Sequence, residues 1–394
     1  MKRRFFLASA GLGLVNLMMG GCAVKSVNSP SLPVQPTYVF YPPPPLPPRI
    51  QYLSTYASES DIVPPASSSF ASFIAGEATS ERRLIQPYGT ALHNGKLYVV
   101  DTGAAGIARF DLRSRKFSTI GSTGNGGMKK PINITISEDG VKYLCDTGRN
   151  QVLVFDQEDQ FVRAIGKAGQ FKPVDSAVRD DRLYVIDIEH HQVQILDKNT
   201  GALISTFGKP GSDPGELFHP TNLAIGPSGD VFVVETSNFR VQRFSPDGTP
   251  IRTYGRIGDT SGSFARPKGI AIDREGRLFV GDAAFENIQM FDNDGQLLLT
   301  FGHLQGAGKG LSLPAGVAID YENVDLFTQF AAPGFNIEFL IMVVSQFGPN
   351  KVDVFGFGQQ SGLDYSSRTP GDHSMPGPDS LSGAAMPFGG HRGA

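Results

Sequence analysis

The chain has 394 residues, of which 40% are hydrophobic and 19% charged, enough to bury the core of one large or two ordinary domains. Its formal net charge of −3 argues against a nucleic-acid-binding protein that relies on bulk positive charge. The two cysteines, Cys22 and Cys145, exclude a disulfide framework and a cysteine-rich metal site. The 47 glycines and 28 prolines favour a fold with many turns.

Residues 1–21 have the three parts of an export signal, with Lys2-Arg-Arg4, an apolar stretch, and small residues before Cys22. Met19-Gly-Gly-Cys22 resembles a bacterial lipobox, and this resemblance implies that Cys22 is acylated and becomes the first mature residue. Ala23 follows it, which by resemblance to enterobacterial sorting favours the outer membrane, facing the periplasm. The alternative is an ordinary secretory signal with an incidental thiol.

Residues 22–48 are poor in charge and contain the run Tyr41-Pro-Pro-Pro-Pro-Leu-Pro-Pro48. Because proline fixes φ and removes a backbone donor, this stretch is predicted to be a polyproline II or disordered tether. The alternative is that the stretch binds a proline-recognising groove of another protein.

An internal repeat follows, in which a strand beginning with proline recurs six times at intervals of 42 to 47 residues. The copies are Pro87-Tyr-Gly-Thr-Ala-Leu92, Pro131-Ile-Asn-Ile-Thr-Ile136, Pro173-Val-Asp-Ser-Ala-Val178, Pro220-Thr-Asn-Leu-Ala-Ile225, Pro267-Lys-Gly-Ile-Ala-Ile272 and Pro314-Ala-Gly-Val-Ala-Ile319. In the first five units, three more short strands follow, as in Leu278-Phe-Val-Gly-Asp282, Asn287-Ile-Gln-Met-Phe291 and a segment ending in Phe301-Gly302. Four strands in a period in the mid-forties predict the blade of a β-propeller.

These motifs resemble the NHL-repeat family over residues 86 to about 358, and the resemblance implies an all-β, six-bladed propeller. The sixth unit lacks a fourth strand, but Leu53-Ser-Thr-Tyr56 matches the fourth-strand segment Ile204-Ser-Thr-Phe207. Residues 49–57 are therefore predicted to complete blade six and close the ring, which gives a propeller of residues 49–358. We expect a short helix between residues 321 and 336, and disorder in the Gly-, Ser- and Pro-rich residues 359–394.

Residues 67–78 carry Phe70, Phe73 and Ile74 at helical spacing. They are predicted to form a short helix packed on one face of the propeller, and a membrane-inserting helix is the alternative.

The repeat places an acidic residue at the end of each of the first five second strands, namely Asp101, Asp146, Asp187, Glu235 and Asp282, with Ser345 in the sixth. Because short carboxylates accept hydrogen bonds from turn backbones, these residues are predicted to be structural. Cys145 lies in the same strand as Asp146 and is predicted to be a buried hydrophobic residue, with a reactive thiol as the alternative.

The third position of each first strand faces the predicted axis and is Gly in three blades, but Asn133, Asp175 and Asn222 in three successive others. Their oxygens would suit Ca²⁺. This resembles lactonases of the gluconolactonase type, which hold a divalent ion on the axis, whereas channel water bound to these side chains is the alternative we favour.

The turns between second and third strands, and the connections between blades, should share one rim. The candidate partner-binding residues there are Arg149, Asn150, His190, His191, Asn238, Phe239, Arg240, Phe285, Glu286, Asn287, Phe347 and Asn350. Adjacent His190 and His191 could instead hold a metal, although no third ligand accompanies them at ligand spacing.

No haem, zinc-protease, nucleophile-elbow or phosphate-loop motif is present in the sequence. The sequence therefore predicts a lipid-anchored propeller of the bacterial cell envelope that binds a protein, peptide or glycan, without a cofactor. A metal-dependent hydrolase or lyase, with its site at the mouth of the axial channel, is the alternative function.

Overall fold

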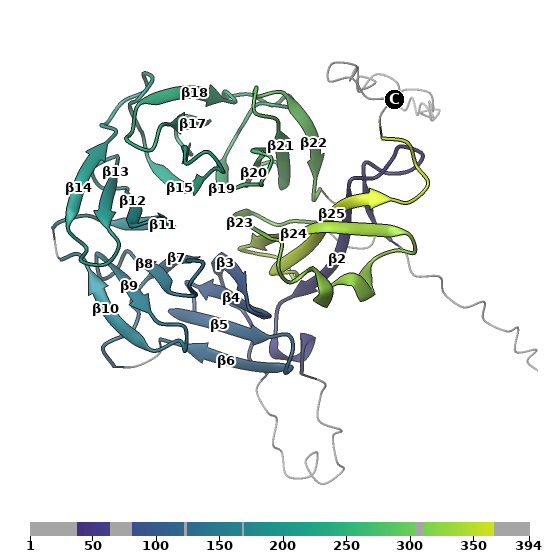
Figure 1. Cartoon of the computed structure of the whole chain (residues 1–394), viewed down its shortest axis with the longest axis horizontal. Helices are drawn as coiled ribbons and strands as arrows, with labels where there is room; N and C mark the ends of the chain where they lie inside the picture. The colour runs from purple at the N-terminus through teal and green to yellow at the C-terminus, as the bar shows by residue number, and fades with distance from the viewer. Residues whose placement is uncertain (1–37, 64–80, 122–123, 168, 304–309, 366–394) are drawn as a thin grey trace, which may run out of the picture. The chain divides into compact units, whose positions relative to one another are not determined.

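The structure is a computed structural model and describes residues 38–63, 81–121, 124–167, 169–303 and 310–365. It is an all-β, six-bladed propeller, as the repeat predicts, and Figure 1 shows the six antiparallel sheets around a common axis. Cys22, residues 1–37, the predicted helix at 67–78 and residues 366–394 lie outside the described residues. Within the described residues, no helix is long and apolar enough to span a membrane.

Blades one to five each contain four consecutive strands in up-and-down order, with the first strand innermost. Blade one is β3 (Pro87–His93), β4 (Lys96–Asp101), β5 (Gly106–Asp111) and β6 (Lys116–Ile120); blade two is β7 (Pro131–Ile136), β8 (Lys142–Asp146), β9 (Gln151–Phe155) and β10 (Phe161–Ile165). Blade three is β11 (Pro173–Arg179), β12 (Arg182–Asp187), β13 (Gln192–Asp197) and β14 (Leu203–Phe207). Blade four is β15 (Pro220–Ile225), β16 (Val231–Glu235), β17 (Arg240–Phe244) and β18 (Pro250–Tyr254); blade five is β19 (Pro267–Ile272), β20 (Leu278–Asp282), β21 (Asn287–Phe291) and β22 (Leu297–Phe301).

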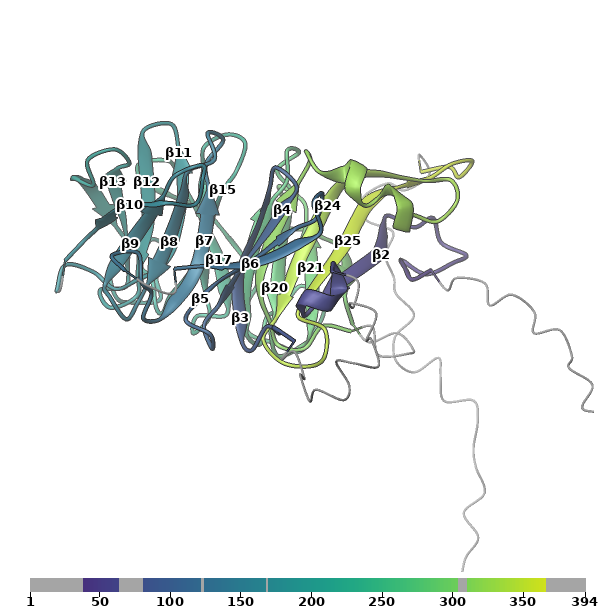
Figure 2. The ribbon, with the colours of Figure 1, turned by 90° about the horizontal axis from the view of Figure 1, so that it is seen from below.

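Blade six joins segments from both ends of the described chain. It contains β23 (Pro314–Asp320), β24 (Phe335–Ser345), β25 (Val352–Gln360) and β2 (Ile50–Tyr56), with β1 (Phe40–Tyr41) added outside β2. β2 pairs with β25 along its length, and Figure 2 shows the two strands side by side. The N-terminal strand therefore closes the ring, as the sequence predicts, and leaves no open seam between the last blade and the first.

Two predictions for the segments at the edge of blade six need correction. Residues 38–48 are not a free tether, because β1 pairs with β2 and the Tyr41 side chain is buried. At the other end β25 continues to Gln360, and the Tyr365 hydroxyl donates to the Pro48 carbonyl at 2.8 Å, so residues 359–365 are ordered on the blade. Apolar side chains of these segments are buried against the blade, which stabilises the segments. Their Pro- and Gly-rich composition did not indicate this burial.

The insertion before β24 forms two single-turn 3-10 helices rather than one amphipathic helix. They are η2 (Val324–Leu326) and η3 (Thr328–Phe330), and a third such turn, η1 (Glu59–Asp61), follows β2. Phe327 lies between η2 and η3 and packs edge-on against Tyr56 of the closing strand. A buried aromatic side chain therefore fixes the insertion to the blade, although no regular helix forms.

The core consists of the apolar faces of adjacent blades. In the second strands almost every residue is buried, as in β16 and β20, because these strands are covered on both faces. Cys145 in β8 is fully buried, and burial raises the pKa of its thiol well above the usual range, which agrees with a core role.

The closing strand meets a buried acid. The Tyr52 hydroxyl of β2 donates to Oδ1 of Asp353 in β25 at 3.3 Å. Burial raises the pKa of Asp353 from 3.8 to about 7, and hydrogen bonds from Thr55 and Tyr52 only partly oppose this. Between about pH 4 and about pH 7, Asp353 therefore keeps a proton in the folded protein that it has lost in the unfolded chain.

Asp353→Asn tests this assignment. Because the folded state binds the extra proton, the free energy of unfolding of the wild type should fall as pH rises from about 4 to about 7. The variant should show a weaker decline and unfold several degrees higher than the wild type at pH 8, as measured by circular dichroism. Asp175 titrates in both proteins, so the difference between their curves isolates Asp353. Parallel curves would contradict the assignment.

Candidate functional site

The acidic residues at the ends of the second strands hold two segments at once. Asp146 accepts backbone N–H groups of Gly148 and Arg149 in its own turn, and of Lys129 and Lys130 in the connection from the previous blade, at 2.7 to 3.1 Å. Asp101 and Asp282 bind the equivalent groups in their blades. The structural role predicted for these acids is therefore confirmed. We call the surface formed by these turns and connections the connecting rim, and the other the opposite rim.

Several of the predicted rim residues occupy a left-handed backbone position in these turns. The fourth residue after each acid has a left-handed conformation with φ between 51° and 55°, namely Ala105, Asn150, His191, Phe239 and Glu286. Outside glycine, this region is sparsely populated and favours Asn. The side chains of Asn150, His191, Phe239 and Glu286 are thus carried by a strained turn position that repeats around the rim.

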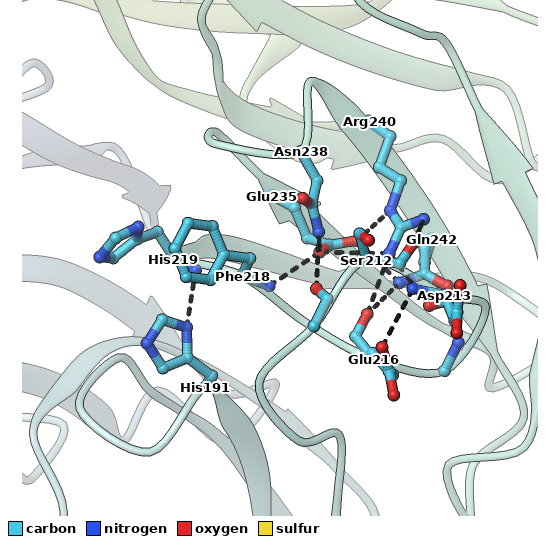
Figure 3. A network of polar contacts seen from close by, with 12 residues as sticks. His191, Ser212, Asp213, Glu216, Phe218, His219, Glu235, Asn238, Arg240 and Gln242 are labelled. Atoms are coloured by element: carbon cyan, nitrogen blue, oxygen red, sulfur yellow. Dashed lines mark hydrogen bonds and ion pairs between the residues drawn. The ribbon is translucent and has the colours of Figure 1, made fainter.

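The rim arginines are bound within the protein. Arg240 donates to Glu235 at 2.6 Å and to the carbonyls of Ser212 and Glu216, which lie in the connection that leads into blade four (Figure 3). Glu235 also accepts from Asn238 and Gln242 in this network. Arg149 plays the same part in blade two, where it donates to the carbonyls of Asn125 and Gly127. Both arginines therefore belong to the framework of the rim, and their role in binding a partner stays a prediction.

The two adjacent histidines have different surroundings. The Nδ1 atom of His190 lies 2.7 Å from the buried Asp187 carboxylate. The His191 ring stacks on Phe218 with 5.0 Å between the ring centres, and its Nδ1 accepts from the backbone of His219 (Figure 3). Burial, followed by the charge of His219, lowers the pKa of His191. The described residues contain no group of three His, Cys, Asp or Glu that could hold a metal ion.

Exposed apolar side chains occur on the connecting rim. Ile85, Phe218, Ile257 and Phe347 are between 39% and 68% exposed. Lys351 links the segment of Ile85 to the segment of Phe347, because its Nζ donates to the carbonyls of Ile85 and Gln346, each at 3.1 Å. In blades one to five, the described turns of the opposite rim hold no exposed large apolar side chain.

The axis is closely packed on one side. A Cβ atom at Gly89 would lie 2.1 Å from Oδ1 of Asn133, one at Gly316 would lie 2.4 Å from the Tyr88 carbonyl, and one at Gly269 would lie 2.8 Å from the Ala315 carbonyl. These distances are shorter than any real contact, so glycine is needed for the close approach of the first strands. The glycines of this ring are therefore structural.

The structure brings the three predicted axial residues together. The side-chain amides of Asn133 and Asn222 lie in hydrogen-bonding distance, 2.9 Å, when the Asn222 oxygen faces Asn133. Asp175 accepts the backbone N–H groups of Ser176 and Leu223, each at 2.9 Å. Burial raises the pKa of Asp175 to about 7, although these hydrogen bonds lower it. The three side chains line a small axial cavity of about 180 Å³ together with residues such as Thr90 and Ala318.

This donor set does not fit a resident Ca²⁺ ion. Each carboxylate oxygen of Asp175 already accepts a backbone N–H group, and the two amides bind one another. A calcium site takes six to eight oxygens and favours ionised carboxylates, whereas burial here favours the protonated acid. We therefore derive no chemistry through a metal at this position.

Sequence reasoning missed two residues at the start of the first strands. Tyr88 in β3 extends across the axis, so that its hydroxyl lies 3.5 Å from the Asn222 side-chain amide in blade four. Lys268 in β19 is buried and lies over the Tyr88 ring, with 5.2 Å between Nζ and the ring centre. A lysine at a position occupied elsewhere by Tyr, Ile, Val, Thr and Ala was the signal that could have found this site.

Comparison with known proteins supports the fold. No family model matches the chain. A gluconolactonase from Xanthomonas campestris is 16% identical, with a TM-score of 0.51 over 82% of this chain and 99% of that one. A Bacteroides thetaiotaomicron protein of unknown function is 14% identical, with a TM-score of 0.52 over 70% of each chain. Virginiamycin B lyase from Staphylococcus aureus is 14% identical, with a TM-score of 0.47 over 69% of this chain and 84% of that one. At these identities the likeness to the Xanthomonas campestris and Bacteroides thetaiotaomicron proteins extends to the propeller fold alone.

Arg240→Met tests whether the rim arginines belong to the framework. It leaves the fully buried Glu235 carboxylate without its ion pair, so we expect a loss of about 3–5 kcal/mol in the free energy of unfolding. Adding Glu235→Gln should recover much of that loss. Arg252→Met, which breaks an exposed pair with Asp294, is the control and should cost no more than about 1 kcal/mol. Urea unfolding measures all three, and an equal response of Arg240→Met and the control would refute the assignment.

Proposed function

We propose that the chain is a lipid-anchored binding module of the bacterial cell envelope that receives a partner on the connecting rim. The observation that carries this proposal is the set of exposed apolar side chains on that rim, Ile85, Phe218, Ile257 and Phe347. Aromatic and aliphatic side chains that project from a framework held by buried ion pairs are typical anchors of a binding surface.

The chemistry of this rim favours a protein or peptide among the partners considered. Arg149 and Arg240 are bound to the framework, so apolar burial supplies the attraction around these turns. The stacked Phe218 and His191 rings present an aromatic face that a hydrophobic side chain of a protein or peptide can cover. Partner binding at this rim requires no cofactor.

The anchor rests on the sequence alone. Cys22 follows a short export signal, and several acyl chains on it would hold the protein at the membrane, for which the outer membrane is the proposed location. In this arrangement the membrane lipid is one partner and the rim ligand is the other.

Enzymatic activity is the competing proposal. The Xanthomonas campestris neighbour is a gluconolactonase, and it shares the propeller fold. In this chain, however, the axial residues Asn133, Asp175 and Asn222 bind one another and nearby backbone groups. We therefore favour partner binding over a metal-dependent hydrolase or lyase.

The rim proposal is tested with two matched double variants. Ile257→Ser with Phe347→Ser removes apolar contacts from the rim, whereas Ile204→Ser with Ile251→Ser removes side chains of about half exposure from the outer strands. The first pair should reduce crosslinking to the partner in intact cells at least tenfold, and the second should leave it unchanged. Both pairs should keep their melting temperature within a few degrees, because the substituted side chains are exposed. Equal crosslinking by the two variants would contradict the proposal.

The anchor is tested with Cys22→Ser. This change removes the thiol that the proposed acylation needs, so labelling by a fatty-acid analogue should be lost and the protein should leave the membrane fraction. Cys145→Ser is the matched control, because Cys145 is buried in the propeller and should leave labelling unchanged. Persistent labelling of Cys22→Ser would rule out the lipoprotein assignment.

A further inference from the structure

Lys268 is a buried cation without a matching anion. Only 8% of the residue is exposed, yet its one hydrogen-bond acceptor among the described residues is Oε1 of Gln346, at 3.4 Å. The other contact of its Nζ is the face of the Tyr88 ring. An ammonium group carries three donors, and a buried charge is costly unless it is paired.

Lys142 shows how this fold satisfies a buried lysine that has a structural role. Its Nζ lies 2.8 Å from the Asp159 carboxylate and donates to the carbonyls of Asp156 and Gln157 at 2.8 and 2.9 Å. Lys268 has none of these partners, and no carboxylate of the described residues forms an ion pair with it. The difference indicates that the Lys268 ammonium has a role other than packing.

The surroundings of Lys268 are positively charged. Arg266 lies two residues before it, is exposed, and acts with burial to lower the pKa of Lys268 to about 8. The acids of this part of the axis bind backbone groups: Asp175 accepts the N–H groups of Ser176 and Leu223, and Asp282 accepts those of Ala265 and Arg266. Among the described residues, neither acid forms an ion pair with the Lys268 ammonium or the Arg266 guanidinium, so the donors of both cations remain available to a ligand.

Tyr88 adds a donor to the same place. Burial, followed by the charge of Asp175, raises the pKa of its hydroxyl, so the group stays protonated at neutral pH. It lies at the axis beside the Asn222 amide. Lys268 and Tyr88 therefore bring an ammonium group from blade five and a phenol from blade one into contact, and Arg266 lies directly before the start of β19, at the same end of the strand as Lys268.

We propose that this axial mouth, formed by Lys268, Arg266, Tyr88 and Gln346, binds a small oxyanion, the carboxylate or phosphate group of a ligand that enters from the connecting rim. Charge-assisted hydrogen bonds from Lys268 and Arg266 would supply the affinity, and the Tyr88 hydroxyl would help to position the anion. The site does not depend on the apolar partner surface proposed above, because it needs neither the exposed rim side chains nor an anchor.

The test uses the purified full chain at pH 7, with sodium phosphate or sodium acetate as the probe and sodium chloride added to constant ionic strength. Binding to the folded state should raise the melting temperature in a saturable way, and calorimetric titration should give the dissociation constant. Lys268→Met should weaken binding at least tenfold, and Arg266→Gln should weaken it severalfold. Lys209→Met, which removes an exposed charge paired with Glu216, should leave it unchanged. A response to phosphate alone would identify a phosphate group as the ligand chemistry, and a response to acetate would identify a carboxylate.

Two features keep the test decisive. Phosphate stabilises many proteins by exclusion from their surface, so the deciding quantity is the difference between the wild type and Lys268→Met. The substitution removes a buried unpaired charge and should leave the unliganded fold at least as stable. If it fails to fold, Arg266→Gln alone decides, because that side chain is exposed. Identical titrations of the wild type and of Arg266→Gln, or no saturable response to either anion, would overturn the proposal.

Discussion

The carboxylate at the end of each second strand is the interaction on which the rest of the propeller depends. In blade two, one buried side chain accepts four backbone N–H groups, two from its own turn and two from the connection that arrives from the previous blade. A buried N–H group without an acceptor is costly, so these connections are held at the place where the carboxylate lies. Each first strand begins directly after the connection that the carboxylate binds, so the carboxylate also determines where that strand lies at the axis. In blade six, Ser345 replaces the acid and retains one such bond, to the backbone of Ser312.

This use of polar groups explains which side chains remain for binding. The polar groups of Arg149, Arg240 and His190 bind carbonyls or carboxylates of the framework, so these groups are already engaged within the protein. Two kinds of side chain on the connecting rim can then carry binding, the exposed apolar side chains and the cations Lys268 and Arg266 near the axis. The two proposals therefore concern different chemistry on one face, and each can fail without the other.

The sequence predicted the propeller well because the repeat carries the features that determine it. The leading proline, the acid at the end of the second strand and the closing glycine recur at nearly constant offsets, and the spare fourth-strand pattern at residues 49–57 located β2. The same register placed Asn133, Asp175 and Asn222 together at the axis. The roles of Arg149 and Arg240 could not be predicted, because nothing in the sequence shows that a long side chain folds back onto the preceding connection. The packing of Tyr41 and Tyr365 was hidden by the composition around them.

The axis itself explains why a site should form on one side of the ring. Gly89, Gly269 and Gly316 let the first strands of blades one, five and six approach so closely that no side chain fits between them. Asn133, Asp175 and Asn222 then occupy the space left by the other three blades. Tyr88 crosses from the glycine side to Asn222, and Lys268 lies on its ring. The small cavity is lined by Asn133, Asp175 and Asn222 and by residues further along the first strands, whereas Lys268 lies one position nearer to the start of its strand and so nearer to the connecting rim. For the Lys268 ammonium the connecting rim is therefore the nearer side, and the exposed apolar side chains lie on that side as well.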